Sequence, residues 1–347
     1  MFEKPEKAII HRLESYYRTN RPDLLNPRLT LDWVNTTGWE SEIYTYTLTS
    51  GKPSQRKTDK RILRLLTGGS MEDAEREYQI LLLLNKARYP VPKVYALGSV
   101  ENGLGNPFII MQCIQGGNFA ERFSASHQRD SEPFDQFITL FRNLHTLDWR
   151  SYVDDPQHFE KQGDPFYHFD RVLTNYADYL SRFNVSGFDP VMDWLHGQRS
   201  RVPFPQSSLV HLDFHHNNIL EDADGKLYVI DWTSAEVSDY RFDLAWTLTL
   251  ALAYRGAAGR ARILEAYEQQ MGGSVPALDV FEVAAILRRI GSVMISLHAG
   301  PEALGMRPEA VEVMRGEVVL LTRLCEHMSH LTGLELSEIR VLIEALE

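Results

Sequence analysis

Three polar residues in and after the segment LVHLDFHHNNIL (Leu209 to Leu220) have types and a spacing that suit phosphoryl transfer. Asn218 follows Asp213 by five residues, and Asp231 in the segment VIDW follows Asn218 by 13 residues. A carboxylate such as Asp213 can accept the proton of an attacking hydroxyl group. An amide and a second carboxylate supply hard oxygen ligands for Mg²⁺, which keeps its other positions for water and substrate phosphates. The pattern therefore predicts Asp213 as the base and Asn218 and Asp231 as metal ligands.

A β-hairpin is the element expected to position this set. The segment EDADGKLYVID contains an Asp-Gly turn at Asp224 and Gly225 between two apolar runs. If 219–221 pairs with 227–230, the open end of the hairpin brings Asn218 close to Asp231. His211 and Asp213 precede this hairpin at the end of another apolar run.

Composition limits the function and location of the chain. Its 347 residues exceed the usual size of a single core, so two lobes are expected. The net charge of -11, with no Lys/Arg-rich run, argues against nucleic acid as a partner. No apolar run approaches the roughly 18 residues of a membrane span, and the first residues do not resemble a signal peptide. Cys113 and Cys325 form no paired motif, so we expect a cytoplasmic protein without a membrane association.

Hydrophobic periodicity predicts an α+β fold. We expect a helix over 4–19, two strands over 29–51, a strand over 60–66 and a helix that opens with a capping box at Ser70 and Asp73. The strand PFIIMQCI ends in QGGN, whose glycine pair is expected to be flexible. The predicted division is a nucleotide-binding lobe over 1–111, a hinge over 112–118 and a mostly helical catalytic and acceptor-binding lobe over 119–347.

With VHLDFHHNNIL, VIDW and YRFDLAW in this order, the chain resembles the aminoglycoside phosphotransferase and choline kinase family. The resemblance implies a bilobal protein-kinase-like fold with a small antiparallel-sheet N-lobe and a mostly helical C-lobe. It also implies an ATP- and Mg²⁺-dependent kinase that phosphorylates a hydroxyl group of a small molecule. His211 and Asp243 would support the catalytic loop.

Further site residues follow from the same resemblance. RILRLL and REYQIL resemble the strand and helix that supply a basic residue and its glutamate partner, here Arg64 and Glu77, with Glu75 as a rival to Glu77. Many kinases have lysine in place of Arg64, and an arginine differs from it in reach and geometry. The remaining nucleotide contacts implied are Gly38 and Ser41 in the phosphate loop, and Gln112, Cys113 and Ile114 against the adenine.

The segment DDPQHFEKQGDPFYHFDRVLTNYADYL suggests the class of acceptor. It mixes acidic and aromatic residues that could hold a cationic group, which favours an amino alcohol or an aminosugar. An acidic, solvated surface over an aromatic core explains the same composition. The residues concerned are Asp154, Asp155, Glu160, Asp164, Asp170, Phe159, Phe166, Tyr167, Phe169 and Tyr176.

Two other functions are compatible with parts of the pattern. If the segment is a strand, His211, Asp213 and His215 lie on one face and could bind a transition metal in a hydrolase. The weak phosphate loop, which has only one glycine, would also suit a nucleotide-binding pseudokinase, although such proteins usually lack the acidic residues present here.

Overall fold

The computed structural model of the protein describes residues 5–35, 41–52, 54–67, 69–125, 131–154, 166–202, 207–304, 306, 308 and 310–346. The chain divides into two compact units. The first unit comprises Met1–Gly117, Leu220–Thr233 and Gly305–Arg307, and the second comprises Asn118–Ile219, Ser234–Leu304 and Pro308–Glu347. Among the described residues, none of the helices has the length and apolar character needed to cross a membrane.

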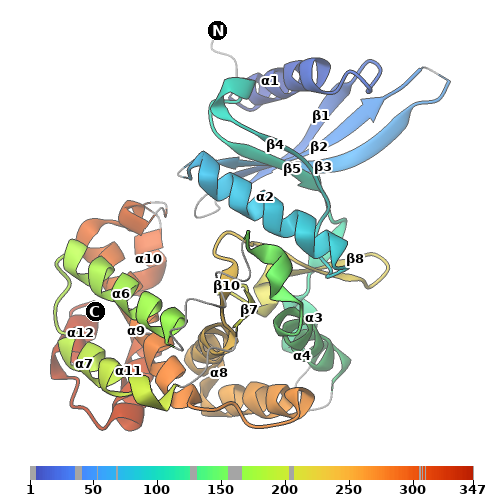
Figure 1. The fold of residues 1–347 in the computed structure, drawn as a ribbon. Helices are drawn as coiled ribbons and strands as arrows, with labels where there is room; N and C mark the ends of the chain where they lie inside the picture. The colour runs from blue at the N-terminus through green and yellow to red at the C-terminus, as the bar shows by residue number, and fades with distance from the viewer. Residues whose placement is uncertain are drawn as a thin grey trace. The chain divides into compact units, whose positions relative to one another are not determined.

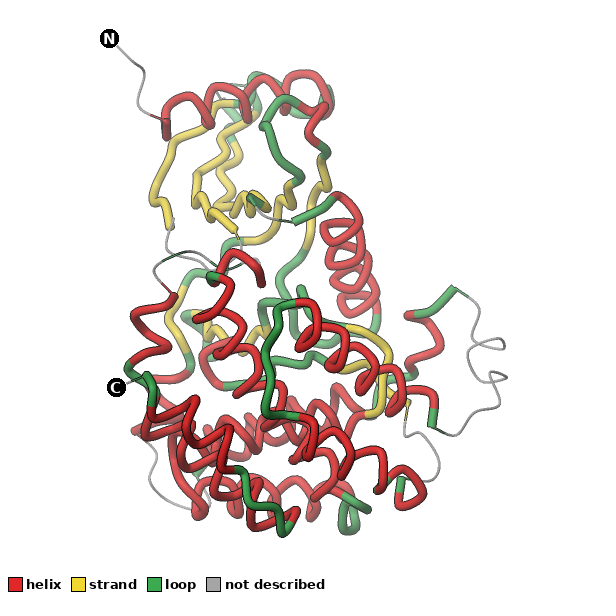
Figure 2. Tube along the Cα trace, turned by 90° about the vertical axis from the view of Figure 1, so that its left-hand side faces the viewer, coloured by secondary structure: helices red, strands yellow, loops and turns green. Residues whose placement is uncertain are grey.

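An antiparallel five-stranded sheet, in the order β1-β2-β3-β5-β4, forms the centre of the first unit (Figure 1). The strands of this sheet and the α-helices of the described part of this unit are α1 (Pro5–Asn20), β1 (Arg28–Asn35), β2 (Ser41–Ser50), β3 (Lys57–Leu66), α2 (Met71–Lys86), β4 (Val94–Gly98) and β5 (Phe108–Gln112). Figure 2 shows the strands in yellow beneath the red helix α1.

Strands β2 and β3 pair over their whole length, and the side chains of β2 alternate in burial. Tyr44, Tyr46 and Leu48 of β2 enter the core, whereas the residues between them are only partly buried. These side chains pack in one cluster with the apolar face of α1, which includes Leu13 and Tyr17. The helical and strand periodicities therefore meet in a common core, as amphipathic elements require. The capping box of Ser70 and Asp73 begins α2 as expected.

The predicted hairpin is present as β8 (Ile219–Asp222) and β9 (Leu227–Val229), within a three-stranded sheet of order β6-β8-β9. Its loop has three residues, 223–225, because the Asp222 N–H pairs with the Lys226 carbonyl across the loop. Within the loop, the Gly225 N–H donates to the Asp222 carbonyl, and Gly225 alone has a positive φ, +80°. This is the geometry of a type I turn followed by a glycine bulge.

The glycine pair of QGGN, expected to be flexible, forms part of strand β6 (Gly116–Asn118). A Cβ atom on Gly116 would lie 1.8 Å from the carbonyl oxygen of Glu221. Glycine is therefore needed here for the close approach of two backbones in a sheet.

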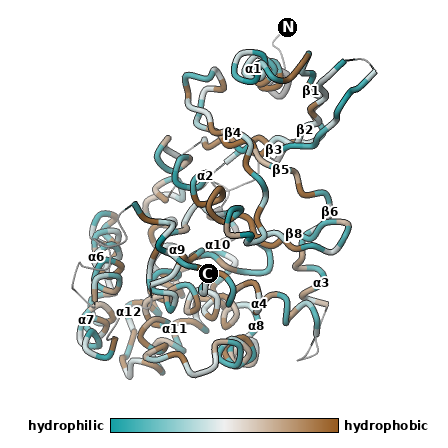
Figure 3. Tube along the Cα trace, turned by 45° about the vertical axis from the view of Figure 1, so that its right-hand side comes forward, coloured by the Kyte–Doolittle hydropathy of each residue, from teal (hydrophilic) through white to brown (hydrophobic). Residues whose placement is uncertain are grey.

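The second unit is mostly helical and has one small antiparallel sheet of β7 (Ser207–Val210) and β10 (Glu236–Asp239). Helix α9 is buried along most of its length, and α8 bends at Gly256, which has a φ of +70°. Helices such as α6 carry both hydrophilic and hydrophobic residues, coloured teal and brown in Figure 3, as expected for a helix with one face on the core. The helices are α3 (Ala120–Ala125), α4 (Glu132–His145), α6 (Tyr167–Arg182), α7 (Asp189–Gly197), α8 (Tyr240–Met271), α9 (Leu278–Ala299), α10 (Ala310–Arg315), α11 (Val318–Thr332) and α12 (Ser337–Glu344).

Candidate active site

In the first unit, three residues that the sequence assigned to the nucleotide and the metal lie together. Arg64 on β3 donates from Nη1 to Glu77 Oε1 at 2.8 Å and from Nη2 to Asp231 Oδ1 at 3.3 Å. The Glu77 side chain on α2 is 2% exposed, whereas that of Asp231 is 42% exposed. Arg64 is thus held between a buried carboxylate and an accessible one.

Burial raises the pKa of Glu77, the charge of Arg64 lowers it, and burial has the larger effect, so the net pKa is above its ordinary value. The ion pair is therefore costly to bury, despite its short distance. A buried ion pair of this kind adds little to the stability of the fold. We interpret its role as fixing the position of the Arg64 guanidinium.

Asp231 has an unusual backbone conformation, with a φ of +67°. Thr233 donates from its hydroxyl to Asp231 Oδ1 at 3.1 Å. The next residue, Trp232, is buried against Tyr89 and donates from Nε1 to the Val229 carbonyl at 3.0 Å, which fixes the turn. Non-glycine residues in this region of φ are strained and often lie at functional sites.

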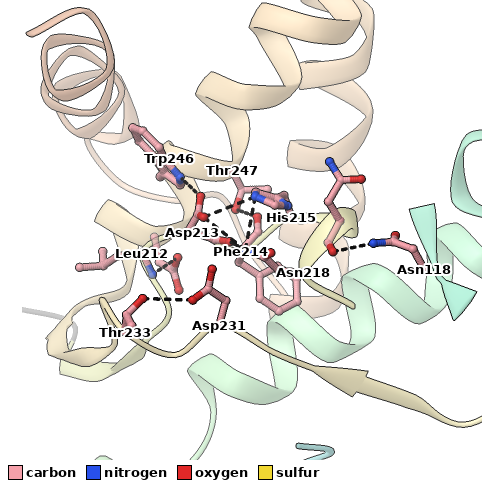
Figure 4. Close-up of polar contacts among 12 residues, drawn as sticks. Asn118, Leu212, Asp213, Phe214, His215, Asn218, Asp231, Thr233, Trp246 and Thr247 are labelled. Atoms are coloured by element: carbon pink, nitrogen blue, oxygen red, sulfur yellow. Dashed lines mark hydrogen bonds and ion pairs between the residues drawn. The ribbon is translucent and has the colours of Figure 1, made fainter. Parts of the chain in front are cut away.

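In the second unit, Asp213 lies in a network of hydrogen bonds that Figure 4 shows. Trp246 Nε1 on α8 donates to Asp213 Oδ1 at 2.9 Å, and Asn218 Nδ2 lies 3.2 Å from Oδ2. His215 Nε2 is 3.4 Å from the same Oδ2. The side chain nevertheless remains 36% exposed, so a small molecule could reach it.

The pKa of Asp213 is well below its ordinary value. Burial alone raises it, but the hydrogen bond and charge of His215 and the hydrogen bond from Trp246 together lower it by more. The carboxylate is therefore ionised throughout the neutral range. Such a weak base can orient a hydroxyl group by accepting its hydrogen bond and takes the proton only when that oxygen has become acidic.

The backbone before Asp213 is strained and held in place by several groups. Leu212 has a φ of +60°. The Asp243 carboxylate, from the first turn of α8, accepts the N–H groups of His211 at 2.7 Å and of Leu212 at 2.9 Å. It also lies 3.1 Å from His145 Nε2. Several buried contacts thus impose the conformation that presents Asp213.

Asn218 and Asp231 have donor atoms that suit a magnesium ion. Asn218 Nδ2 donates to the Asp213 carbonyl at 3.0 Å, so its other amide atom is a carbonyl oxygen directed elsewhere. Both hydrogen bonds described for the Asp231 carboxylate use Oδ1. Amide and carboxylate oxygens are the ligand types that Mg²⁺ prefers. The structure assigns Asn218 to the second unit and Asp231 to the first.

The other residues predicted to contact the nucleotide are Gly38 and Ser41 in the phosphate loop and Gln112, Cys113 and Ile114 in the hinge. Gly38 lies outside the described residues, and Ser41 is buried at the start of β2. The Gln112 N–H donates to the Lys93 carbonyl oxygen at 2.7 Å. The Cys113 N–H donates to the Lys60 carbonyl oxygen at 3.3 Å. Because those two amides are used within the protein, a base bound here would require other backbone groups, including those of Ile114.

The premise of the transition-metal hypothesis was wrong. Strand β7 ends at Val210, and the positive φ of Leu212 breaks the alternation that would put His211, Asp213 and His215 on one face of a strand. Across the described ranges, no group of three His, Cys, Asp or Glu residues has the arrangement of a metal site.

The acidic segment that suggested a cationic acceptor is described only in part. Asp170 forms an ion pair with Arg199 at 2.7 Å, and Phe169 packs in the core against Phe242 and Phe281. These contacts agree with the alternative of a solvated surface over an aromatic core. Asp155, Phe159, Glu160 and Asp164 lie outside the described residues.

Three residues near Asp213 were missed by the sequence reasoning. Trp246 lies in the quoted motif YRFDLAW, three residues after Asp243, and this spacing places both on one side of a helix. That spacing was a usable signal. His145 and Arg288 are far away in sequence, and no local pattern indicates their contacts with Asp243 and Leu212.

The sequence and the fold of the chain were compared with those of known proteins. Residues 38–281 match the phosphotransferase enzyme family. A Ralstonia eutropha protein assigned as an aminoglycoside phosphotransferase has a similar fold, with a TM-score of 0.64 and 18% identity over 92% of this chain and 98% of that one. The ethanolamine kinase of Plasmodium vivax has a TM-score of 0.62 and 13% identity, over 94% of this chain and 90% of that chain.

Choline kinase LicA from Streptococcus pneumoniae has a TM-score of 0.55 and 15% identity, over 92% and 99% of the two chains, and LicA has also been crystallised with AMP. By sequence, the chain is 24% identical over 193 residues to the probable acyl-CoA dehydrogenase IBR3 of Arabidopsis thaliana. That match covers 51% of this chain and only 23% of the plant protein. The predicted α+β, protein-kinase-like fold is confirmed by the structural similarities.

Proposed function

Since the chain belongs to the phosphotransferase enzyme family, we propose that it transfers the γ-phosphoryl group of ATP to a hydroxyl group of a small molecule. The observation that carries this proposal is the arrangement around Asp213. An accessible, ionised carboxylate is held by an indole N–H on a strained loop, and the buried Asp243 fixes that loop. Such preorganisation is costly and is typical of a reacting centre.

Asp213 would act on the acceptor. Its carboxylate accepts the hydrogen bond of the acceptor hydroxyl, whose oxygen forms a bond to the γ-phosphorus as the bond from that phosphorus to the bridging oxygen of ADP breaks. The proton of the hydroxyl moves to Asp213, and ADP leaves with the electron pair. The lowered pKa of Asp213 makes this proton transfer late, after the new bond to phosphorus has begun to form.

Asn218 and Asp231 would hold Mg²⁺ through their side-chain oxygens. The ion, when bound, neutralises charge on the triphosphate. Thr233 and Arg64 position the Asp231 carboxylate by donating to its Oδ1.

Arg64 would contact the nucleotide phosphates, with Glu77 as the residue that positions it. The buried pair keeps the guanidinium close to Asp231, and a guanidinium offers a bidentate fork to phosphate oxygens. The hinge residues Gln112 to Ile114 would lie against the adenine. The backbone N–H groups of Gln112 and Cys113 already donate within the protein, so they would not bind the base. Gly38 and Ser41 would contribute further contacts to the phosphates.

The acceptor is the second substrate of the proposed reaction. An amino alcohol or aminosugar, favoured by the acidic segment, would agree with the choline and ethanolamine kinases of similar fold. The described acid Asp170 is neutralised by Arg199, however, and so offers little attraction to an ammonium group. A cytoplasmic location stays a prediction from the sequence.

A screen that follows ADP release tests the proposal. Purified protein with ATP and Mg²⁺ is incubated with sets of neutral, cationic and anionic hydroxyl compounds, and mass spectrometry identifies the phosphorylated product. We expect at least one set to raise ADP release above the rate with water alone. Nucleotide binding without any acceptor-dependent release would favour a pseudokinase.

A further inference from the structure

Arg288 on α9 contacts two of the residues that position Asp213, namely Leu212 and Trp246. Its Nη1 donates to the carbonyl oxygen of Leu212, the residue before Asp213, at 3.0 Å. Its Cζ lies 4.1 Å from the ring centroid of Trp246, whose indole N–H donates to Asp213. The guanidinium is therefore fixed beside the base by a hydrogen bond and by a cation–π contact.

Within the described part of the chain, Arg288 lacks the carboxylate partner that several arginines of the second unit have. Arg171, Arg199 and Arg241 each form an ion pair with a carboxylate, at distances of 2.6, 2.7 and 2.6 Å. Arg288 forms no ion pair with any carboxylate of the described residues, and its described hydrogen bond goes to a backbone carbonyl. A guanidinium has five N–H donors, so Arg288 keeps donors for a further oxygen ligand.

Tyr176 on α6 adds a second polar group to this region. Burial raises the pKa of its phenol, while the charge of Arg288 lowers it and that of Glu236 raises it. Glu236 is itself paired with Arg171, through two hydrogen bonds of 2.8 and 2.6 Å, so its carboxylate is already engaged.

We infer that the phosphoryl acceptor carries an oxyanion, a carboxylate or a phosphate ester, and that Arg288 binds it while Asp213 accepts the hydrogen bond of the reacting hydroxyl. The inference rests on the proposed function, because that function makes Asp213 the position of the hydroxyl. A planar guanidinium suits bidentate binding of either oxyanion. An ammonium group in the same position would be repelled by Arg288, which disfavours an amino alcohol.

A matched panel of acceptors tests this inference on the full chain. It contains hydroxy acids of three to six carbons, the diols and amino alcohols of the same lengths, and glycerol phosphate, each assayed for ADP release with ATP and Mg²⁺. We expect turnover of hydroxy acids or of glycerol phosphate, and the arm that responds identifies the oxyanion. Turnover confined to diols or amino alcohols and lost in Asp213→Asn would overturn the inference and leave the proposed function standing.

Variants of Arg288 separate binding of the acceptor from support of the loop. Removing a hydrogen bond to a charged group should raise the acceptor KM about 10- to 100-fold in Arg288→Gln, and less in Arg288→Lys, which keeps the charge. Arg288→Glu should shift the preference from anionic towards cationic acceptors. Arg201→Gln, which removes an exposed arginine paired with Asp279, is the matched control and should behave as the wild type.

Two other results would also count against the inference. If Arg288→Gln and Arg288→Glu lower turnover of every acceptor class by the same factor, Arg288 serves only to hold the Leu212 carbonyl. If no compound raises ADP release in wild-type protein that binds ATP, the proposed function fails and the inference fails with it.

Discussion

Replacing Glu77 by glutamine separates a residue that positions Arg64 from one that stabilises the fold. The substitution keeps the size and shape of a side chain that is 2% exposed, and it removes the charge 2.8 Å from Arg64 Nη1. Arg64 keeps its ion pair with Asp231, at 3.3 Å. We expect the guanidinium to lose its fixed position and to bind the nucleotide phosphates less well.

The two expected effects differ greatly in size. The pKa of Glu77 is raised above 4.5 because burial outweighs the charge of Arg64, so ionising this carboxylate at neutral pH opposes folding. A neutral amide avoids that cost, and Arg64 keeps Asp231, so the free energy of unfolding should change by about 1 kcal/mol or less. Loss of a charge-assisted hydrogen bond worth about 1.5–3 kcal/mol should raise the KM for ATP roughly 10- to 100-fold.

Denaturant unfolding and steady-state kinetics measure both quantities on the same preparation. Glu75→Gln is the matched control, because Glu75 is an exposed acid on the same helix, and it should leave both unchanged. The reasoning is refuted if Glu77→Gln destabilises the protein by about 3–5 kcal/mol, as expected for a lone buried charge, and leaves the KM for ATP equal to that of the control.

Three further changes test other parts of the site and the fold. Asp231→Ala removes a proposed metal ligand and should weaken Mg²⁺-dependent ATP binding by about 100-fold or more in calorimetry, so an unchanged affinity would exclude that role. Trp246→Phe removes the indole donor from Asp213, which should raise the pKa of Asp213 and lower kcat about tenfold, with little change in the KM for ATP; equal kcat values would show that this hydrogen bond is unimportant. Burial and the charge of Arg171 lower the pKa of His168 from 6.5 to about 4, so its contribution to stability is complete above pH 6.5 and is lost as the pH falls towards 4. Urea unfolding should therefore show a loss of about 2 kcal/mol between pH 7.5 and 5 that is absent in His168→Gln and present in the exposed-residue control His196→Gln; parallel pH profiles would contradict this.

Local patterns were sufficient to predict much of the fold. The apolar alternation of β2 and the helical periodicity of α1 depend on neighbours within a few residues, so they are readable without the tertiary structure. The hairpin of β8 and β9 was predicted from its flanking apolar runs, but the loop length was not, since it depends on which turn residues adopt a positive φ.

Contacts between residues far apart in sequence could not be predicted in the same way. Arg288 touches Leu212 across 76 residues, and its importance depends on the absence of a carboxylate partner among the described residues. Gly116 appeared flexible by composition, whereas the approach of Glu221, over a hundred positions later, makes glycine a steric requirement. Both features are consequences of tertiary packing, which no local pattern contains.

The most direct test of the proposed phosphotransferase is a comparison of Asp213→Asn with the wild type, in which acceptor phosphorylation and nucleotide affinity are measured together. The amide keeps the shape of the carboxylate and removes its ability to accept a proton. We expect acceptor phosphorylation to fall by about 10²-fold or more, while calorimetry gives an ATP affinity within about threefold of the wild type. Near-normal phosphorylation by Asp213→Asn would contradict the assignment of Asp213 as the base.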